Sequence, residues 1–130
     1  VRSEFDWRIG VLSGQPLYAC KYHMARNHWQ IIHREANGKK SYGKIENVAL
    51  EEVPLPALDL ALRACKVVGD GLYGVDLKQI GNRFLVIEVN DNPSIDSGFE
   101  DALTGDDLYR RIMRVFVERL DGRRGTFRAP

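Results

Sequence analysis

Apolar and polar residues alternate at the start of the chain. Phe5 and Trp7 fall on one face of a strand predicted over residues 5–12, and Arg8 falls on the other face. A turn signal rich in glycine and serine ends this strand, and a second β-like run covers residues 17–24. The pattern therefore predicts two neighbouring strands joined by a short turn.

Less regular sequence follows these strands. Residues 29–33 form a candidate third strand. Residues 34–47 are polar and contain glycine, and the stretch is longer than a usual connection between elements. We expect a mobile loop there.

Two amphipathic helices are predicted from the spacing of apolar residues. Pro54 opens the first helix, which runs to about Val68, because proline suits a first helical turn. The second helix runs from about Asp106 to Leu120, and residues 122–130 are expected to form a flexible tail. The predicted buried face of the second helix consists of Leu108, Ile112, Val115, Phe116 and Leu120.

A β-hairpin is predicted between the two helices. Residues 72–80 and 83–90 read as strands, and a glycine-containing turn separates them. In the second of these strands, Leu85, Ile87 and Val89 are expected to face the core.

The same hairpin carries a cluster of oxygen-bearing side chains. Asp76 lies in the middle of its strand, and Glu88 and Asn90 lie two residues apart, so these two share a face. Carboxylate and amide oxygens suit Mg²⁺ or Mn²⁺. A polar, solvated face on an antiparallel hairpin is the alternative interpretation.

The register of the hairpin decides whether the acids meet. A two-residue turn at Gly81-Asn82 pairs Asp76 with Ile87 and sends the two acids to opposite faces. A three-residue loop pairs Asp76 with Glu88 instead. The hypothesis of a metal site therefore predicts the three-residue loop, together with a bulge.

Length and charge limit the classes of protein. The 130 residues suffice for one domain with a core, and no apolar run approaches the ~20 residues of a membrane helix. The net charge of +1 argues against a dedicated nucleic-acid binder.

Cys20 and Cys65 lie among apolar neighbours, which predicts buried free thiols and a reducing, cytoplasmic compartment. Because the sequence starts with valine, we expect a longer parent chain.

The motifs of the hairpin resemble a known family. Gly-Val-Asp-Leu at 74–77, followed by Val-Ile-Glu-Val-Asn-Asp-Asn-Pro at 86–93, is similar to the metal-binding end of ATP-grasp ligases. The likeness is greatest to the RimK-type group, which adds glutamate to protein or peptide carboxylates and is related to glutathione-synthase-like enzymes. It covers residues 4 to about 120. Residues 26–44 depart from the RimK-type pattern.

The resemblance implies roles for five residues. Asp76, Glu88 and Asn90 match the metal ligands of the family, and Glu88 and Asn90 would also contact the cofactor ATP. Arg8 resembles the catalytic arginine that contacts phosphate and acyl-phosphate oxygens. Lys21 matches a basic, cofactor-binding position on the following strand.

The resemblance also implies a fold and a domain organisation. The fold class is α+β, with a mostly antiparallel sheet and two main helices packed on one face. Residues 1–121 would form the C-terminal ATP-grasp subdomain. The lobe that carries the purine pocket and the phosphate-binding lysines would precede these residues in the family, so the fragment alone is expected to be inactive.

The implied activity is that of an ATP- and Mg²⁺-dependent carboxylate–amine ligase. A substrate carboxylate attacks the γ-phosphoryl group of ATP and becomes an acyl phosphate, which an amine converts to an amide. The expected partners are ATP, a carboxylate substrate, an amino-acid amine and the preceding lobe, with no nucleic acid and no membrane, and a homo-oligomer is allowed. A non-catalytic domain that retains the fold to bind a nucleotide or a partner is the alternative.

Overall fold

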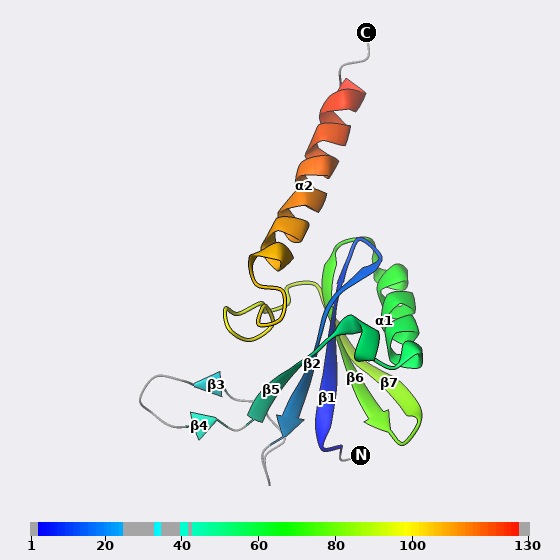
Figure 1. Ribbon diagram of the computed structural model, residues 1–130. Coiled ribbons are helices and arrows are strands. Elements are labelled where there is room, and N and C mark those ends of the chain that lie inside the picture. Colours follow the sequence, from blue (N-terminus) through cyan, green and yellow to red (C-terminus); the bar gives the residue numbers. More distant parts are fainter. Residues whose placement is uncertain (1–2, 25–32, 35–39, 42, 128–130) are drawn as a thin grey trace.

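The computed structural model of the protein describes residues 3–24, 33–34, 40–41 and 43–127 (Figure 1). Its strands are β1 (Phe5–Leu12), β2 (Gln15–Met24), β3 (His33–Arg34), β4 (Lys40–Ser41), β5 (Gly43–Val48), β6 (Leu72–Ile80) and β7 (Arg83–Asn90). Its helices are the short 3₁₀ turn η1 (Leu50–Glu52), α1 (Leu55–Val68) and α2 (Asp106–Phe127).

An antiparallel sheet forms the centre of the molecule. Five strands lie in the order β5-β2-β1-β6-β7, and β3 and β4 form a separate two-stranded ribbon. The α+β class expected from the sequence is confirmed. Strand β1 has partners on both sides, which agrees with its burial along nearly its whole length.

A two-residue turn, Ser13-Gly14, joins β1 and β2 into a tight hairpin. Ser13 and Gly14 both have positive φ angles, +51° and +75°. Two central residues with positive φ characterise the type I′ turn, whose twist matches that of the flanking strands. The predicted first strand, residues 5–12, is confirmed, and β2 begins two residues earlier than predicted, at Gln15.

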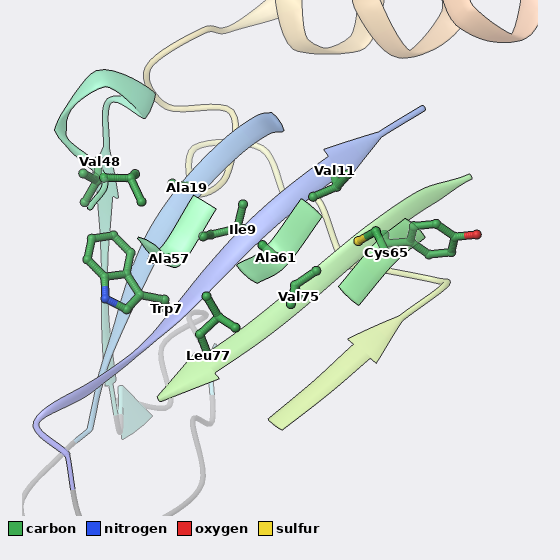
Figure 2. Close-up of a cluster of buried hydrophobic side chains, with 12 residues drawn as sticks. Trp7, Ile9, Val11, Ala19, Val48, Ala57, Ala61, Cys65, Val75 and Leu77 are labelled. Atoms are coloured by element: carbon green, nitrogen blue, oxygen red, sulfur yellow. The ribbon is translucent and has the colours of Figure 1, made fainter. Parts of the chain in front are cut away.

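Helix α1 covers one face of the sheet. Its start after Pro54 and its end before Gly69 confirm the sequence prediction. The helix presents Ala57, Ala61 and Cys65, one helical turn apart, to the strands below (Figure 2). Small side chains at these positions let the helix lie close to the sheet. The opposing layer of this core consists of Trp7, Ile9, Val11, Ala19, Val75 and Leu77.

The other face of the sheet has its own core, and α2 contributes to it. Leu108 is buried there, and Ile112 and Val115 pack against the same cluster. The expectation that both helices pack on one face was therefore wrong. The two helices contact opposite faces, because β1 and β2 carry apolar side chains on both sides. The strand residues of this second core are Leu12, Leu17, Tyr18, Cys20 and Tyr22.

Only the first part of α2 contacts the sheet. The helix then projects away from it (Figure 1), so Phe116 and Leu120, which were predicted to be buried, are exposed. The helix also continues to Phe127, beyond the predicted end at Leu120. Arg119 ties it to the domain, because its Nη2 donates to Ser13 Oγ at 3.1 Å and to the carbonyl oxygen of Asp70.

Part of the predicted loop is a strand. Residues 43–48 form β5, which pairs with β2 from Ala19 to Met24, so the mobile loop expected over 34–47 was wrong there. Alternating apolar residues are few in this strand, which is why the pattern did not predict it. The candidate strand at 29–33 lies outside the described residues, except for His33 in β3.

Both cysteines are buried free thiols, as predicted. They lie on opposite faces of the sheet, Cys65 in the core under α1 and Cys20 in the core near α2. Within the described part of the chain, no helix is long and apolar enough to cross a membrane.

Candidate functional site

The hairpin of β6 and β7 brings the two predicted acids together. Asp76 lies directly opposite Glu88, and Gly74 lies opposite Asn90. Side chains of directly paired residues project from the same face of a sheet. Glu88 and Asn90 therefore share the face of Asp76, as the hypothesis of a metal site required.

The turn that produces this register is not the one predicted. Ile80 pairs with Arg83, so only Gly81 and Asn82 form the turn. The φ of +60° at Gly81 matches the first central position of a type II′ turn. The three-residue loop was therefore wrong, and a bulge alone restores the pairing of the acids.

The bulge lies at Ile87. Leu77 pairs with Val86 and the next residue, Asp76, pairs with Glu88, so Ile87 is the extra residue of β7. Because of this shift, the β7 side chains that precede the bulge lie on the faces opposite to those predicted. Phe84 packs with Val89 against the core under α1, whereas Leu85 and Ile87 are exposed, and the prediction that both face the core was wrong.

Arg8 forms the closest contact of Asp76. Arg8 Nε donates to Asp76 Oδ1 at 2.8 Å, and Nη2 donates to Oδ2 at 3.0 Å. The two residues are also directly paired across β1 and β6. Burial by itself would lower the pKa of Arg8, but the hydrogen bonds and charge of Asp76 outweigh burial and raise it. The site thus holds a permanently charged guanidinium against a carboxylate.

A second ring of contacts supports Arg8. Its guanidinium carbon lies 4.7 Å from the centre of the Tyr22 ring. Tyr22 Oη donates at 2.6 Å to Oε1 of Glu100, and the backbone N–H of Asp96 donates to the other oxygen at 2.9 Å. Burial, and then the hydrogen bond to Glu100, raise the pKa of Tyr22, so the phenol remains protonated and donates.

A cavity of about 200 Å³ lies beside Arg8. Tyr22 and Glu100 form part of its wall, and the segment after β7 contributes Ser94 and Asp96. It is smaller than the roughly 300–1,000 Å³ typical of drug-sized ligands. The cavity therefore adjoins the hairpin through Arg8, which contacts Asp76, and its size suits a small group.

The donor atoms present fit a hard divalent cation. Asp76 and Glu88 supply carboxylate oxygens, and Asn90 supplies an amide oxygen that accepts the N–H of Asn92 at 2.9 Å and has a second lone pair. Within the residues that the structure describes, no three His, Cys, Asp or Glu side chains gather closely enough to hold a metal. A metal here would need the amide oxygen and oxygens from its ligand or water, which is how Mg²⁺ is commonly bound.

Lys21 lies on the opposite face from this cluster. It pairs with Trp7, and its Nζ lies 4.8 Å from the centre of the Phe5 ring and 5.1 Å from that of Trp7. The structure thus brings together Arg8, Asp76 and the face of Glu88, but not Lys21. A role of Lys21 in cofactor binding stays a prediction.

Sequence reasoning missed two members of the site, Tyr22 and Glu100. Tyr22 follows Lys21 in a strand, and a single tyrosine there has no motif to mark it. Glu100 has 3% of its surface exposed and receives two hydrogen bonds, which only the folded path of residues 91–105 shows. The signal available was an acidic residue directly after Phe99 in a turn-rich segment.

The fold is shared with one part of the ATP-grasp ligases. The ATP-grasp ligase PsnB, complexed with a phosphomimetic variant of a minimal precursor, Mg and ADP, is 23% identical, with a TM-score of 0.55 over 77% of this chain and 28% of its own. D-alanine–D-alanine ligase from Bacillus anthracis, complexed with ATP, is 16% identical, with a TM-score of 0.61 over 92% of this chain and 43% of its own. The sequence matches no protein-family model and no curated protein.

These similarities show the fold of the chain and how much of each solved structure has it. This chain spans less than half the length of either solved structure. A PsnB complex with precursor peptide PsnA2 and AMPPNP matches similarly, at 24% identity and a TM-score of 0.51 over 77% of this chain and 27% of that one. The three structures hold a nucleotide, and two of them hold a precursor as well.

Proposed function

We propose that this chain is the C-terminal part of the ATP-grasp domain of an ATP- and Mg²⁺-dependent carboxylate–amine ligase. The observation that carries the proposal is the register of β6 and β7, which sets Glu88 opposite Asp76 on the face that Arg8 occupies. Nothing in the packing of the core requires two acids at these positions. The three similar structures described above hold ADP, AMPPNP or ATP, and one of these three also holds Mg.

The oxygen-bearing side chains and the arginine would have different roles. Mg²⁺, when bound, would neutralise phosphate charge, and Asp76, Glu88 and Asn90 would hold it. Arg8 would orient the phosphoryl group and stabilise the negative charge that develops on it during transfer. The substrate carboxylate would become an acyl phosphate, and an amine would then displace phosphate to form an amide.

The exposed aliphatic side chains of β7 fit the apolar part of a nucleotide. Ile87 precedes Glu88 directly, and 56% of its surface is exposed. An exposed isoleucine next to a polar cluster is the arrangement expected where a ligand has an apolar ring and a charged end. We propose that the purine of ATP covers Ile87.

The finer assignment is a RimK-type ligase that adds glutamate, with a preceding lobe that completes the ATP site. The motif at residues 86–93 supports this assignment. The isolated 130 residues would then be inactive, since they match only 27–43% of the similar structures. Two free cysteines are compatible with a cytoplasmic location.

The test is ADP release by the longer parent protein. The protein is incubated with ATP, Mg²⁺ and pooled amino acids and peptides, and ADP is measured with and without the amines. We expect amine-dependent release that falls at least 100-fold in Glu88→Gln. The matched control is Glu118→Gln, which makes the same change on an exposed part of α2 and should leave the rate unchanged.

Other outcomes would reject the ligase. If the folded parent binds ATP but releases no ADP with a broad pool, the non-catalytic alternative takes its place. If neither ATP nor Mg²⁺ binds, the ATP-grasp assignment of the site fails. If Glu88→Gln unfolds the domain and leaves metal binding intact, the role given to Glu88 is wrong.

A further inference from the structure

The group proposed to hold the metal is already occupied by a cation. Arg8 contacts both oxygens of Asp76, at 2.8 and 3.0 Å, and 22% of each side chain is exposed. A divalent cation that contacts the same carboxylate would stand within a few ångströms of the guanidinium, and like charges repel strongly in a half-buried site. Arg8 and the metal therefore compete for Asp76.

The surroundings of Arg8 give it another place to lie. Its side chain borders the cavity of about 200 Å³, which is also lined by Tyr22 of β2 and Ile45 of β5. The Tyr22 ring supports the guanidinium at 4.7 Å, and Nη1 already lies 3.5 Å from Tyr22 Oη. A rotation about the end of the side chain toward this cavity would free the carboxylate.

We propose that Arg8 is an exchangeable counter-ion, which neutralises Asp76 when nucleotide is absent and moves to the phosphate oxygens when the nucleotide and its metal bind. This inference rests on the proposed function, because it takes a polyphosphate as the ligand that attracts Arg8. Its consequence is linkage: the metal binds poorly until an anion removes Arg8, and each ligand raises the affinity of the other by the same factor.

The molecule contains a matched control on the same face. Lys78 Nζ lies 2.9 Å from Asp6 Oδ1, and these side chains are 23% and 22% exposed. The pair joins the same two strands, two residues along from Arg8 and Asp76. It has no part in the proposed site, so Lys78→Met removes one positive charge and one ion pair from the same face without freeing Asp76.

The experiment measures metal affinity directly. The longer parent protein, free of nucleotide, is titrated with Mn²⁺, and free Mn²⁺ is followed by electron paramagnetic resonance. Arg8→Met should bind Mn²⁺ about tenfold more tightly than the unmodified protein, since the competing charge is gone. Lys78→Met should bind it with unchanged affinity. Arg8→Lys keeps the charge but cannot span both oxygens, so it should give a smaller increase, and it serves if Arg8→Met does not fold.

A second titration separates the two claims. Binding of Mg·ATP is measured for the same proteins and for Glu88→Gln. If Mg·ATP binds in a manner that depends on Glu88, but neither Arg8 variant binds Mn²⁺ more tightly, the exchange is disproved and the ligase site stands. An equal increase in Lys78→Met would also disprove it, because the effect would then be general. If Mg·ATP does not bind to any of the proteins, the proposed function fails and the exchange fails with it.

Discussion

Asp76 and Glu88 are direct cross-strand neighbours, although a regular hairpin with the two-residue turn between β6 and β7 would pair Asp76 with Ile87. The extra residue Ile87 makes this possible, because it shifts the second half of β7 by one position relative to β6. The bulge thus changes which face each side chain of β7 occupies. It joins the acids of the candidate site and at the same time exposes Ile87 beside them.

The role given to Ile87 predicts a change in nucleotide affinity without a change in stability. Ile87→Gln should lower the affinity of the parent protein for ATP about tenfold, because the purine loses an apolar surface. The free energy of unfolding should change by less than about 0.5 kcal/mol, as at other exposed positions. Val67→Gln, on the exposed side of α1, is the control and should change neither quantity. Equal ATP affinity in Ile87→Gln would contradict the assignment.

Removing the hydroxyl of Tyr18 and removing that of Tyr22 should have opposite effects on the free energy of unfolding. Among the described residues, Tyr18 Oη is buried with no hydrogen-bond partner, so Tyr18→Phe should be neutral or stabilise the protein by up to about 1 kcal/mol. Tyr22→Phe removes the bond to Glu100 and should cost about 1–3 kcal/mol, because it leaves a buried acceptor unpaired. Urea unfolding of both variants measures the difference. Destabilisation of equal size would show that Tyr18 Oη has a partner of its own.

Gly10 should tolerate no side chain while Tyr18 is present. A Cβ at Gly10 would overlap atoms of the Tyr18 ring, which lies over it across β1 and β2. We expect Gly10→Ala to destabilise the protein by about 1–3 kcal/mol, and Tyr18→Leu in the same chain to recover part of that loss.

The control for this pair is Gly122→Ala. Apart from its chain neighbours and the backbone of its own helix α2, no atom lies within 4 Å of a Cβ built there, so this change should stabilise the protein by about 0.5–1 kcal/mol. Purely additive effects of the changes at positions 10 and 18 would contradict the packing described.

Alkaline pH should weaken the fold. Burial raises the pKa of Tyr18 and Tyr22 above the ordinary value of 10.0, and it raises that of Cys20 from 9.0 to about 12. Groups with a raised pKa bind protons more tightly when folded, so their stabilisation is complete below the unfolded-state pKa and is lost as pH rises above it. The free energy of unfolding should therefore be level near pH 8 and fall above about pH 9.

Urea unfolding at constant ionic strength from pH 8 to 11 measures this fall. In Tyr22→Phe the decrease above pH 10 should be shallower, by up to about 1.4 kcal/mol per pH unit. A profile that stays level to pH 11 would show that these groups ionise as easily in the folded protein as in the unfolded one.

The sequence predicted the elements whose hydrophobic period is clear. Residues 5–12 and 55–68 match β1 and α1, because one strongly apolar face sets each of them. The polar strand β5 was missed, because it is stabilised by its pairing with β2 and its own side chains show no clear hydrophobic pattern. The exposed half of α2 was predicted as buried, because an amphipathic pattern does not show where the sheet beneath it ends.

The candidate site was predicted in part. The spacing of Asp76, Glu88 and Asn90 predicted that they share one face, which the register confirms, and the bulge that aligns them was expected with the wrong turn. No local pattern indicates that Arg8 bonds to Asp76, which lies 68 residues away, or that Tyr22 and Glu100 support it. Such contacts depend on the strand order, which the sequence leaves open.

The most direct test of the account is the position of the metal itself. Crystals of the longer parent protein grown with Mn²⁺ and a non-hydrolysable ATP analogue give an anomalous signal that locates the ion. We predict an anomalous peak about 2.0–2.3 Å from oxygens of Glu88 and Asn90, next to Asp76, with Arg8 turned from that carboxylate toward the phosphates. A bound analogue with the Mn²⁺ peak away from these residues, or with no peak near β7, would contradict the site.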